Sequence, residues 1–252
     1  MHGLELISGL VAYRLLVSVA FAVGFFLALI RLQRASYELI PTVEILAGGV
    51  WAAFLGGVAL HWAVAKTYEL LLPRSGEQVF GGITVIGGLI ASLVTMIWLC
   101  WRRGIDHRPF LDIVCVTVPL CQAIGRLGCL CAGCCFGRVT SSPLAMQLPN
   151  LDGVIAPRFP TQIMSAVANL LIFSALLVVE RLSTGRGCLR VYPGFVLHLF
   201  FALYCLKRSI IELLRDTAPP IIGPFTWVHF LTLPGFIVLL VVMIRRLRLT
   251  MS

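Results

Sequence analysis

The sequence predicts an all-α integral membrane protein with about seven transmembrane helices, and two observations carry that prediction. Hydrophobic residues make up 59% of the 252 residues and charged residues only 12%, whereas soluble domains carry about a quarter charged residues. A membrane-spanning helix needs roughly 20 predominantly apolar residues, and the chain offers such stretches at 10–30, 41–65, 81–101, 111–130, 161–179, 192–214 and 225–244. We therefore expect a single polytopic membrane domain over 1–252.

The first stretch is predicted to remain in the membrane as a span. It is too long, and too polar at its start, for a cleaved signal peptide. The longest connection, at 133–160, is rich in proline, serine, threonine and glycine, which indicates an exposed outer loop.

Orientation follows from the basic residues of the connections. The connections after the first, third and fifth spans and the C-terminal tail hold eleven arginines, whereas the opposite connections hold five basic residues. Because basic residues concentrate on cytoplasmic loops, we expect the N-terminus outside and the C-terminus in the cytoplasm. This distribution accounts for most of the formal net charge of +9, so the charge indicates topology and not binding to nucleic acid.

Ionisable residues gather toward the predicted outer side. The fourth span runs outward and carries Arg126 in its outer half. The sixth span also runs outward, and four of its residues fall on one helical face because they are spaced by four, four and three positions. These residues are Tyr204, Arg208, Glu212 and Arg215.

Arginine side chains within a bilayer indicate a site. One arginine at mid-bilayer costs about 2.5–3.5 kcal/mol on insertion scales. We expect Arg126 and Arg208 to face an outward- or laterally-facing polar cavity, where guanidinium groups hold an anion such as a lipid phosphate. The alternative is that Arg208 pairs with Glu212 within its helix and Arg126 extends to the headgroups.

Further residues are expected at the same outer side. Tyr13 and Arg14 begin the first span, His61 ends the second and His229 begins the seventh. The stretch GGITVIGGLI opens the third span. Its glycine pairs favour close helix packing over approach of the backbone to a ligand.

Four motifs follow one another along the chain: GGITVIGGLI, QAIGRLGCLCAGCCFGR, RFPTQ and YCLKRSIIELLR. Together they resemble the prolipoprotein diacylglyceryl transferase family, over about 81–240. The resemblance implies a multi-pass enzyme of the bacterial inner (plasma) membrane. Such an enzyme moves a diacylglyceryl group from phosphatidylglycerol to the lipobox cysteine thiol of a prolipoprotein signal peptide and releases glycerol phosphate. No cofactor is expected.

The resemblance also implies roles for particular residues. Arg126 would hold the phospholipid head group. Arg208 would stabilise the leaving phosphate, with Tyr204 donating a hydrogen bond and Glu212 positioning Arg208 or Arg215. The other phospholipid-binding candidates are the glycines that let the backbone come close and two residues of RFPTQ, namely Gly125, Gly128, Gly137, Arg158 and Gln162.

The chain departs from the family pattern at several positions. Ile86 stands where the family commonly has a histidine, a proposed general base, and Cys129 and Cys134 replace an asparagine and an acidic residue. QIMS stands in place of QLYE, and an arginine late in the second span is absent. His61 and His229 are the candidate replacement bases. The alternative is a non-catalytic, redox or thiol-handling phospholipid-binding protein on the same fold.

Four cysteines follow Arg126 in a crowded cluster, Cys129, Cys131, Cys134 and Cys135. The spacing lacks the two separated pairs that are usual for zinc, so no metal is predicted. A disulfide or redox role on an oxidising face, and a role as small packing residues, both remain open. A thiol beside a guanidinium also has a lowered pKa, which allows the hypothesis of a covalent lipid intermediate on Cys134.

Overall fold

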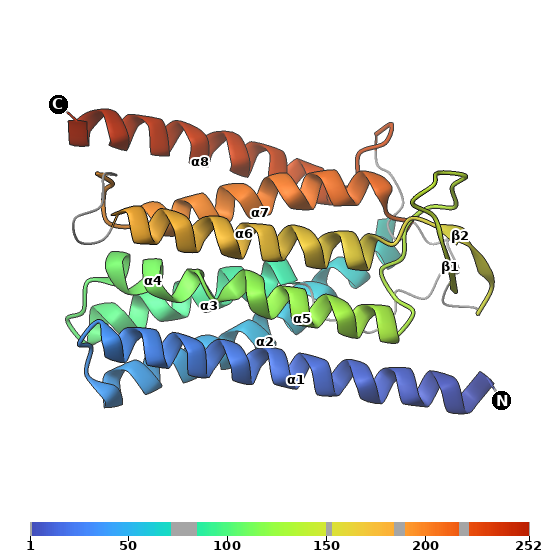
Figure 1. The fold of residues 1–252 in the computed structure, drawn as a ribbon, viewed down its shortest axis with the longest axis horizontal. Helices are drawn as coiled ribbons and strands as arrows, with labels where there is room; N and C mark the ends of the chain where they lie inside the picture. The colour runs from blue at the N-terminus through green and yellow to red at the C-terminus, as the bar shows by residue number, and fades with distance from the viewer. Residues whose placement is uncertain (1, 72–84, 150–152, 184–189, 217–221, 252) are drawn as a thin grey trace. The chain divides into compact units, whose positions relative to one another are not determined.

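The computed structural model describes residues 2–71, 85–149, 153–183, 190–216 and 222–251. Helices dominate, and a short antiparallel pair of strands interrupts them (Figure 1). The elements, in chain order, are α1 (His2–Arg34), α2 (Leu39–Leu71), α3 (Val85–Arg102), α4 (His107–Cys115), α5 (Val118–Cys131), β1 (Met146–Pro149), β2 (Ile155–Arg158), α6 (Thr161–Ser183), α7 (Phe195–Leu214) and α8 (Trp227–Met251). The first four residues of the predicted third span, 81–84, lie outside the described residues.

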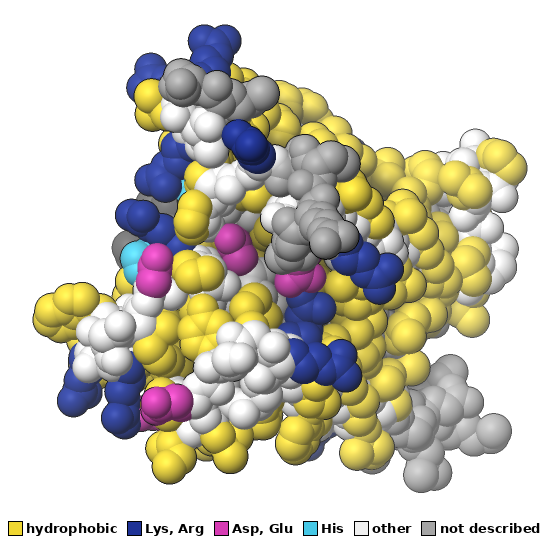
Figure 2. Space-filling model, turned by 60° about the vertical axis from the view of Figure 1, so that its left-hand side comes forward, with side chains coloured by type: hydrophobic (Ala, Val, Ile, Leu, Met, Phe, Trp, Pro, Cys, Tyr) yellow, Lys and Arg dark blue, Asp and Glu magenta, His cyan; other side chains and the backbone are white. Residues whose placement is uncertain are grey.

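Within the described residues, six helical stretches are long and apolar enough to cross a membrane. They are Gly9–Arg34, Leu39–Thr67, Val85–Arg102, His107–Cys131, Thr161–Ser183 and Trp227–Thr250. Figure 2 shows one face of the molecule, on which hydrophobic side chains cover much of the surface and Lys and Arg side chains lie in separate groups. The predicted class, a multi-pass helical membrane protein, is therefore confirmed.

The predicted sixth span corresponds to α7, which does not belong to these six. The helix is long enough, but its second half carries Lys207, Arg208 and Glu212. The other six predicted spans match the six apolar stretches. A seventh crossing and the orientation of the termini stay predictions.

The chain forms two compact units. Unit 1 comprises Met1–Gly24 and Leu111–Ser252, and unit 2 comprises Phe25–Phe110. In unit 1, α5 packs on α6, α6 on α7 and α7 on α8. In unit 2, α2 packs along α3. The expectation of one domain stays a prediction.

The predicted fourth span is two helices and not one. Helix α4 ends at Cys115 and α5 begins at Val118, with Thr117 as the residue before it and a proline in its first turn. The proline ring lacks an N–H and suits the first turn of a helix, where that N–H would have no intrahelical partner. Within α4, Asp112 lies beside the start of α7, where its two carboxylate oxygens accept hydrogen bonds from the backbone N–H groups of Gly194 (2.7 Å) and Leu197 (2.8 Å).

The predicted outer loop at 133–160 is more ordered than expected. Strands β1 and β2 pair in antiparallel register, with Met146 opposite Arg158 and Pro149 opposite Ile155. The buried residues of this segment include Phe136, Leu148 and Arg158. The segment folds back because its backbone hydrogen-bonds with the ends of neighbouring helices, which composition alone does not reveal.

Close backbone contact explains the second glycine pair of GGITVIGGLI. A Cβ on Gly87 would lie 2.5 Å from the carbonyl oxygen of Gly56, and one on Gly88 would lie 2.7 Å from that of Ala53. Both distances are too short for a side chain, so α2 and α3 approach only where glycine faces backbone. The interpretation as helix packing is confirmed for this pair, and the neighbouring Ile86 is buried.

We expect Gly87→Leu to destabilise unit 2. A leucine side chain at this contact must push α3 away from α2, and overpacking of this kind costs about 1–3 kcal/mol. Thermal unfolding of the purified protein in detergent measures the change. Val94→Leu, at an exposed position of the same helix, is the matched control and should leave the unfolding midpoint within error of the parent.

Candidate functional site

Most of the predicted site residues lie at one end of unit 1. We call it the polar end; it comprises the end of α5, the segment after it, the start of α6 and the end of α7. The segment after α5 is held there by the start of α6 and the end of α7. The Thr161 hydroxyl donates to the carbonyl of Cys135 (2.7 Å), and the backbone N–H of Arg138 donates to the carbonyl of Leu214 (2.9 Å). A Cβ on Gly137 would lie 2.5 Å from the carbonyl oxygen of Phe159. Gly137 therefore serves protein packing at this point.

Helix α1 closes one side of the polar end. A Cβ on Gly128 would lie 3.3 Å from the ring of Tyr13, and one on Gly9 would lie 2.5 Å from the carbonyl oxygen of Cys131. The amino-terminal half of α1 therefore runs beside the carboxyl-terminal half of α5. At Gly125, by contrast, an added Cβ meets no atom within 4 Å, so this is the predicted glycine that borders open space.

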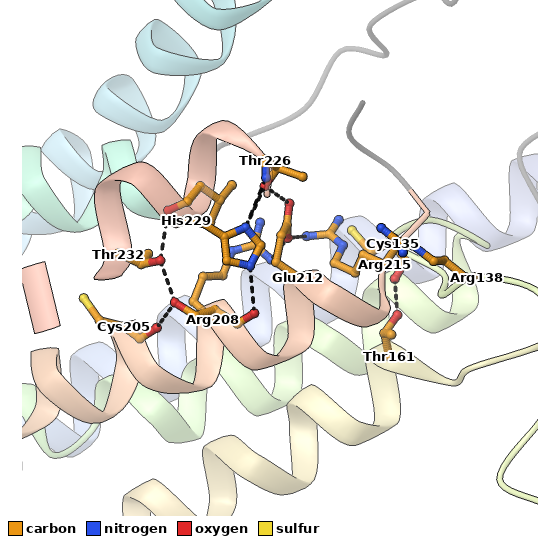
Figure 3. A network of polar contacts seen from close by, with 12 residues as sticks. Cys135, Arg138, Thr161, Cys205, Arg208, Glu212, Arg215, Thr226, His229 and Thr232 are labelled. Carbon is orange, nitrogen blue, oxygen red and sulfur yellow. Dashed lines mark hydrogen bonds and ion pairs between the residues drawn. The ribbon is translucent and has the colours of Figure 1, made fainter. Parts of the chain in front are cut away.

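Glu212 is the centre of the ion network on α7. Its carboxylate lies 2.7 Å from Arg208 Nη1 and 3.5 Å from Arg215 Nη1, and it accepts a hydrogen bond from the Thr226 hydroxyl (3.3 Å; Figure 3). The Glu212 side chain is only 2% exposed, and the two arginines are 13% and 12% exposed. The helical face predicted from the spacing therefore holds these three residues together.

Arg126 supplies a third guanidinium. It interacts electrostatically with Tyr204 and with Arg208. Among the described residues no carboxylate forms an ion pair with it. Arg208 and Arg215 thus share the carboxylate of Glu212 and Arg126 has no ion-pair partner among the described residues, so three positive charges face one negative charge in this part of the polar end. Such an arrangement favours an anion with several oxygens, since one guanidinium group can donate two parallel hydrogen bonds to two phosphate oxygens.

Lys207 is a buried cation that the sequence reasoning missed. Its ammonium donates to Asn169 Oδ1 (2.7 Å) and lies 4.7 Å from the centre of the Tyr204 ring. The signal was available, because Lys207 precedes Arg208 inside an apolar stretch. Its partner Asn169 in α6 does not belong to any of the four sequence motifs.

Arg158 and Gln162 contact the protein and not open space. Arg158 pairs with Asp216 (3.2 Å) and stacks on the Phe136 ring (4.7 Å). Gln162 is 2% exposed and donates to the carbonyl of Cys134 (2.8 Å). These contacts hold the segment after α5 in position, so they favour a supporting role over direct lipid binding.

The two histidines offered as replacement bases lie in different environments. His229 is buried, and its Nδ1 accepts from the Thr226 backbone N–H (3.2 Å) while Nε2 lies 3.2 Å from the Ser209 carbonyl (Figure 3). A neutral ring with its proton on Nε2 satisfies both contacts and keeps no lone pair for a substrate. His61 lies in α2, which belongs to unit 2.

Three of the four clustered cysteines converge on one point. The sulfur atoms of Cys129, Cys134 and Cys135, which we call the thiol triad, all lie within 4.8 Å of one another. Cys131 is exposed and stands apart from them. Cys135 has φ 62°, a left-handed conformation that only one other non-glycine residue, Ser36, adopts in the described part of the chain. This conformation costs a non-glycine residue about 1–2 kcal/mol, so the surrounding contacts must impose it.

The surroundings of the triad shift the pKa values of Cys135 and Cys134 in opposite directions. Hydrogen bonds from Cys129 and Cys134, and next the positive charges of Arg215 and Arg126, hold the pKa of the Cys135 thiol well below its usual range. Hydrogen bonding to the other two thiols raises the pKa of Cys134. A thiolate is therefore favoured at Cys135, with the other two thiols as donors to it.

The fold and the polar end define a class of protein: a multi-pass helical membrane protein with buried arginines and clustered thiols at its helix ends. Comparison with known proteins narrows this class. The sequence model of the prolipoprotein diacylglyceryl transferase family matches residues 5–245. The chain belongs to this family.

Individual relatives agree with the family match. The phosphatidylglycerol–prolipoprotein diacylglyceryl transferase of Clostridium tetani is 30% identical over 171 residues, which cover 66% of this chain and 65% of that protein. The protein of the same name from Prochlorococcus marinus (strain MIT 9215) is 30% identical over 233 residues, covering 84% of this chain and 77% of the relative. That from Gluconacetobacter diazotrophicus is 33% identical over 148 residues, covering 57% and 51%. The chain thus spans between about half and about three quarters of these relatives.

Removing the shared carboxylate should destabilise the polar end. We expect Glu212→Gln to lower the free energy of unfolding by about 3 kcal/mol, because breaking a buried ion pair leaves uncompensated charge. Thermal unfolding in detergent measures this loss. Glu38→Gln, at an exposed glutamate, is the matched control; an equal effect of both changes would contradict the central place of Glu212.

The lowered pKa of Cys135 predicts its alkylation profile. A depressed pKa means that the thiolate persists to lower pH, so reaction with iodoacetamide should reach its plateau below the ordinary thiol pKa of about 8.5. Cys134→Ala removes a donor and should shift the profile to higher pH, whereas Cys131→Ala should leave it in place. Peptide mass spectrometry of protein in chelator-treated buffer identifies the modified residue at each pH.

Proposed function

We propose that the chain transfers a diacylglyceryl group from phosphatidylglycerol to the cysteine thiol of a prolipoprotein lipobox. Membership of the family and the names of the relatives support this reaction. The observation that carries it is a cluster of guanidiniums at the polar end, in which Arg208 and Arg215 pair with the buried Glu212 and Arg126 interacts electrostatically with Arg208. A phosphodiester brings the negative charge that this cluster lacks.

In this reaction the acceptor sulfur attacks the glyceryl carbon that bears the phosphate. A C–S bond forms, the C–O bond breaks, and its electron pair remains on the phosphate oxygen of the departing glycerol phosphate. Negative charge therefore grows on the leaving group in the transition state. Preorganised positive groups aimed at such a charge contribute the largest part of catalysis in many enzymes.

The roles follow from the contacts. Arg126 has no carboxylate partner among the described residues and follows Gly125, where an added Cβ would meet open space, so it suits the head group of the incoming lipid. Arg208 suits the phosphate that leaves, because Glu212 fixes its position. The buried Tyr204 interacts electrostatically with both arginines and suits a hydrogen bond to the same phosphate.

The cellular setting is also a proposal. Membership of the family supports a location in the bacterial inner membrane, and the distribution of basic residues along the chain supports an orientation with the polar end toward the outer leaflet. In that orientation, a signal peptide that has reached the outer face would present its cysteine beside the phospholipid.

We expect Arg126→Gln and Arg208→Gln each to lower transfer by about 100-fold or more, the usual effect of losing a donor to a developing oxyanion. Detergent-solubilised protein, labelled phosphatidylglycerol and a lipobox peptide form the assay, and mass spectrometry detects the thioether-linked lipopeptide.

Arg14→Gln is the matched control, since Arg14 is exposed on α1. It should keep the parental rate. Parental turnover in either Arg126→Gln or Arg208→Gln would contradict the proposed site. Absence of product with the unaltered protein, while a relative is active in the same assay, would contradict the reaction itself.

A further inference from the structure

The thiol triad is the strongest feature of unit 1 that the proposed phosphate site does not use. Its sulfur atoms lie within 4.8 Å of one another. Two thiolates on one tetrahedral zinc ion, each bonded at about 2.3 Å, lie about 3.8 Å apart. Each sulfur therefore needs to move by only about 1 Å or less to share one ion.

Hydrogen bonds fix the backbone of the triad residues in position. The N–H of Cys134 turns back to the carbonyl of Cys129 (3.1 Å) at the end of α5. Gln162 then fixes the carbonyl of Cys134 (2.8 Å), and Thr161 fixes that of Cys135 (2.7 Å). These contacts from α6 account for the left-handed conformation of Cys135. Ligands held by a supporting shell are what a metal site requires.

We propose that Cys129, Cys134 and Cys135 bind one zinc ion as three thiolates, and that its open fourth position takes the acceptor cysteine thiol. Zinc sites with three protein ligands and one open position are the catalytic kind, whereas structural sites close all four. Cys131 is exposed outside the triad, so the described cysteines offer no fourth protein thiol at this point.

The surrounding charge suits this ion. Three thiolates and Zn²⁺ carry a net charge of −1, and a bound acceptor thiolate makes the net charge −2. Arg126 and Arg215 interact electrostatically with the triad and would offset part of that charge. Thiolate ligands favour zinc over hard ions such as Mg²⁺ or Ca²⁺.

The chemistry fills a gap in the proposed function, on which this part of the inference rests. A thiol must become a thiolate before it attacks carbon, and Ile86 cannot accept a proton. A coordinated thiol loses its proton outright. The acceptor S–H would release its proton to solvent on binding, and the zinc-bound sulfur would then donate its electron pair to the glyceryl carbon. The thioether formed is a weaker ligand and leaves the ion.

The departure from the sequence expectation has a geometric reason. The spacing of the four cysteines lacked two separated pairs, which argued against a four-thiolate site. The structure leaves one of the four outside and brings the other three together across a helix end and a left-handed residue. That is a three-ligand arrangement, to which the spacing argument does not apply.

Metal content tests the site without any assay of transfer. Protein purified under reducing conditions and loaded with Zn²⁺ should hold about one zinc ion per chain by elemental analysis after desalting. Cys129→Ser and Cys134→Ser should each lose it, while the matched control Cys131→Ser should keep it. Cd²⁺ in place of Zn²⁺ should add a thiolate-to-cadmium absorption band to the unaltered protein and to Cys131→Ser only, with circular dichroism and gel filtration showing that every variant is folded.

The acceptor role has its own readout. A lipobox peptide should change the cadmium band, and the same peptide with its cysteine replaced by serine should not. Transfer by Cys134→Ser should fall at least tenfold, and transfer by Cys131→Ser should not change.

Each contrary result overturns a defined part of the proposal. Failure of the unaltered protein to retain zinc, or a disulfide within the triad in reduced preparations, overturns the metal site. Unchanged transfer by zinc-free Cys134→Ser overturns the acceptor role and leaves the proposed function standing. Zinc binding without any lipid transfer overturns the proposed function and leaves the metal site standing.

Discussion

The polar end depends on the burial of one carboxylate between cationic side chains. Glu212 is nearly inaccessible, and it contacts both Arg208 and Arg215 from the same helix. Without it, the guanidiniums would repel one another in a poorly screened environment. With it, they remain in place but are not neutralised, because Arg126 contributes a further positive charge. An excess of positive charge therefore remains at the polar end, which suits the proposed binding of a phosphate.

The segment after α5 depends on that same region. It reaches the end of α7 through the backbone contact between Arg138 and Leu214, and the Arg138 side chain donates to the carbonyl of Arg215 (3.1 Å). Gly137 permits the close approach. The triad is therefore built on the same framework that positions the arginines, and this framework brings the proposed metal ligands close to the proposed phosphate-binding side chains. Such proximity suits a reaction in which sulfur replaces a phosphate oxygen at carbon.

The chain differs from the family pattern in the groups that could accept a proton. The chain keeps the positively charged side chains that a phosphodiester leaving group needs and lacks the histidine at position 86. Contacts with Thr226 and Ser209 engage both ring nitrogens of His229 and so disfavour it as the replacement base. Lys207 is buried against Asn169 and Tyr204. The proposed zinc ion would let thiolates do what a base does elsewhere.

The sequence by itself determined the membrane class, six of the apolar helices and the residues of the cationic face, because each follows from composition or from a helical period that needs no knowledge of neighbours. The spacing of Arg208, Glu212 and Arg215 is of this local kind. Only the tertiary structure decided that α4 and α5 are separate helices, that Arg158 pairs with Asp216, and that Cys131 stands apart from the other three thiols. The pairing of Arg158 with Asp216 depends on contact between segments distant along the chain, and the helix break and the turn that separates the cysteines depart from a continuous helix, so a helical period does not predict any of the three.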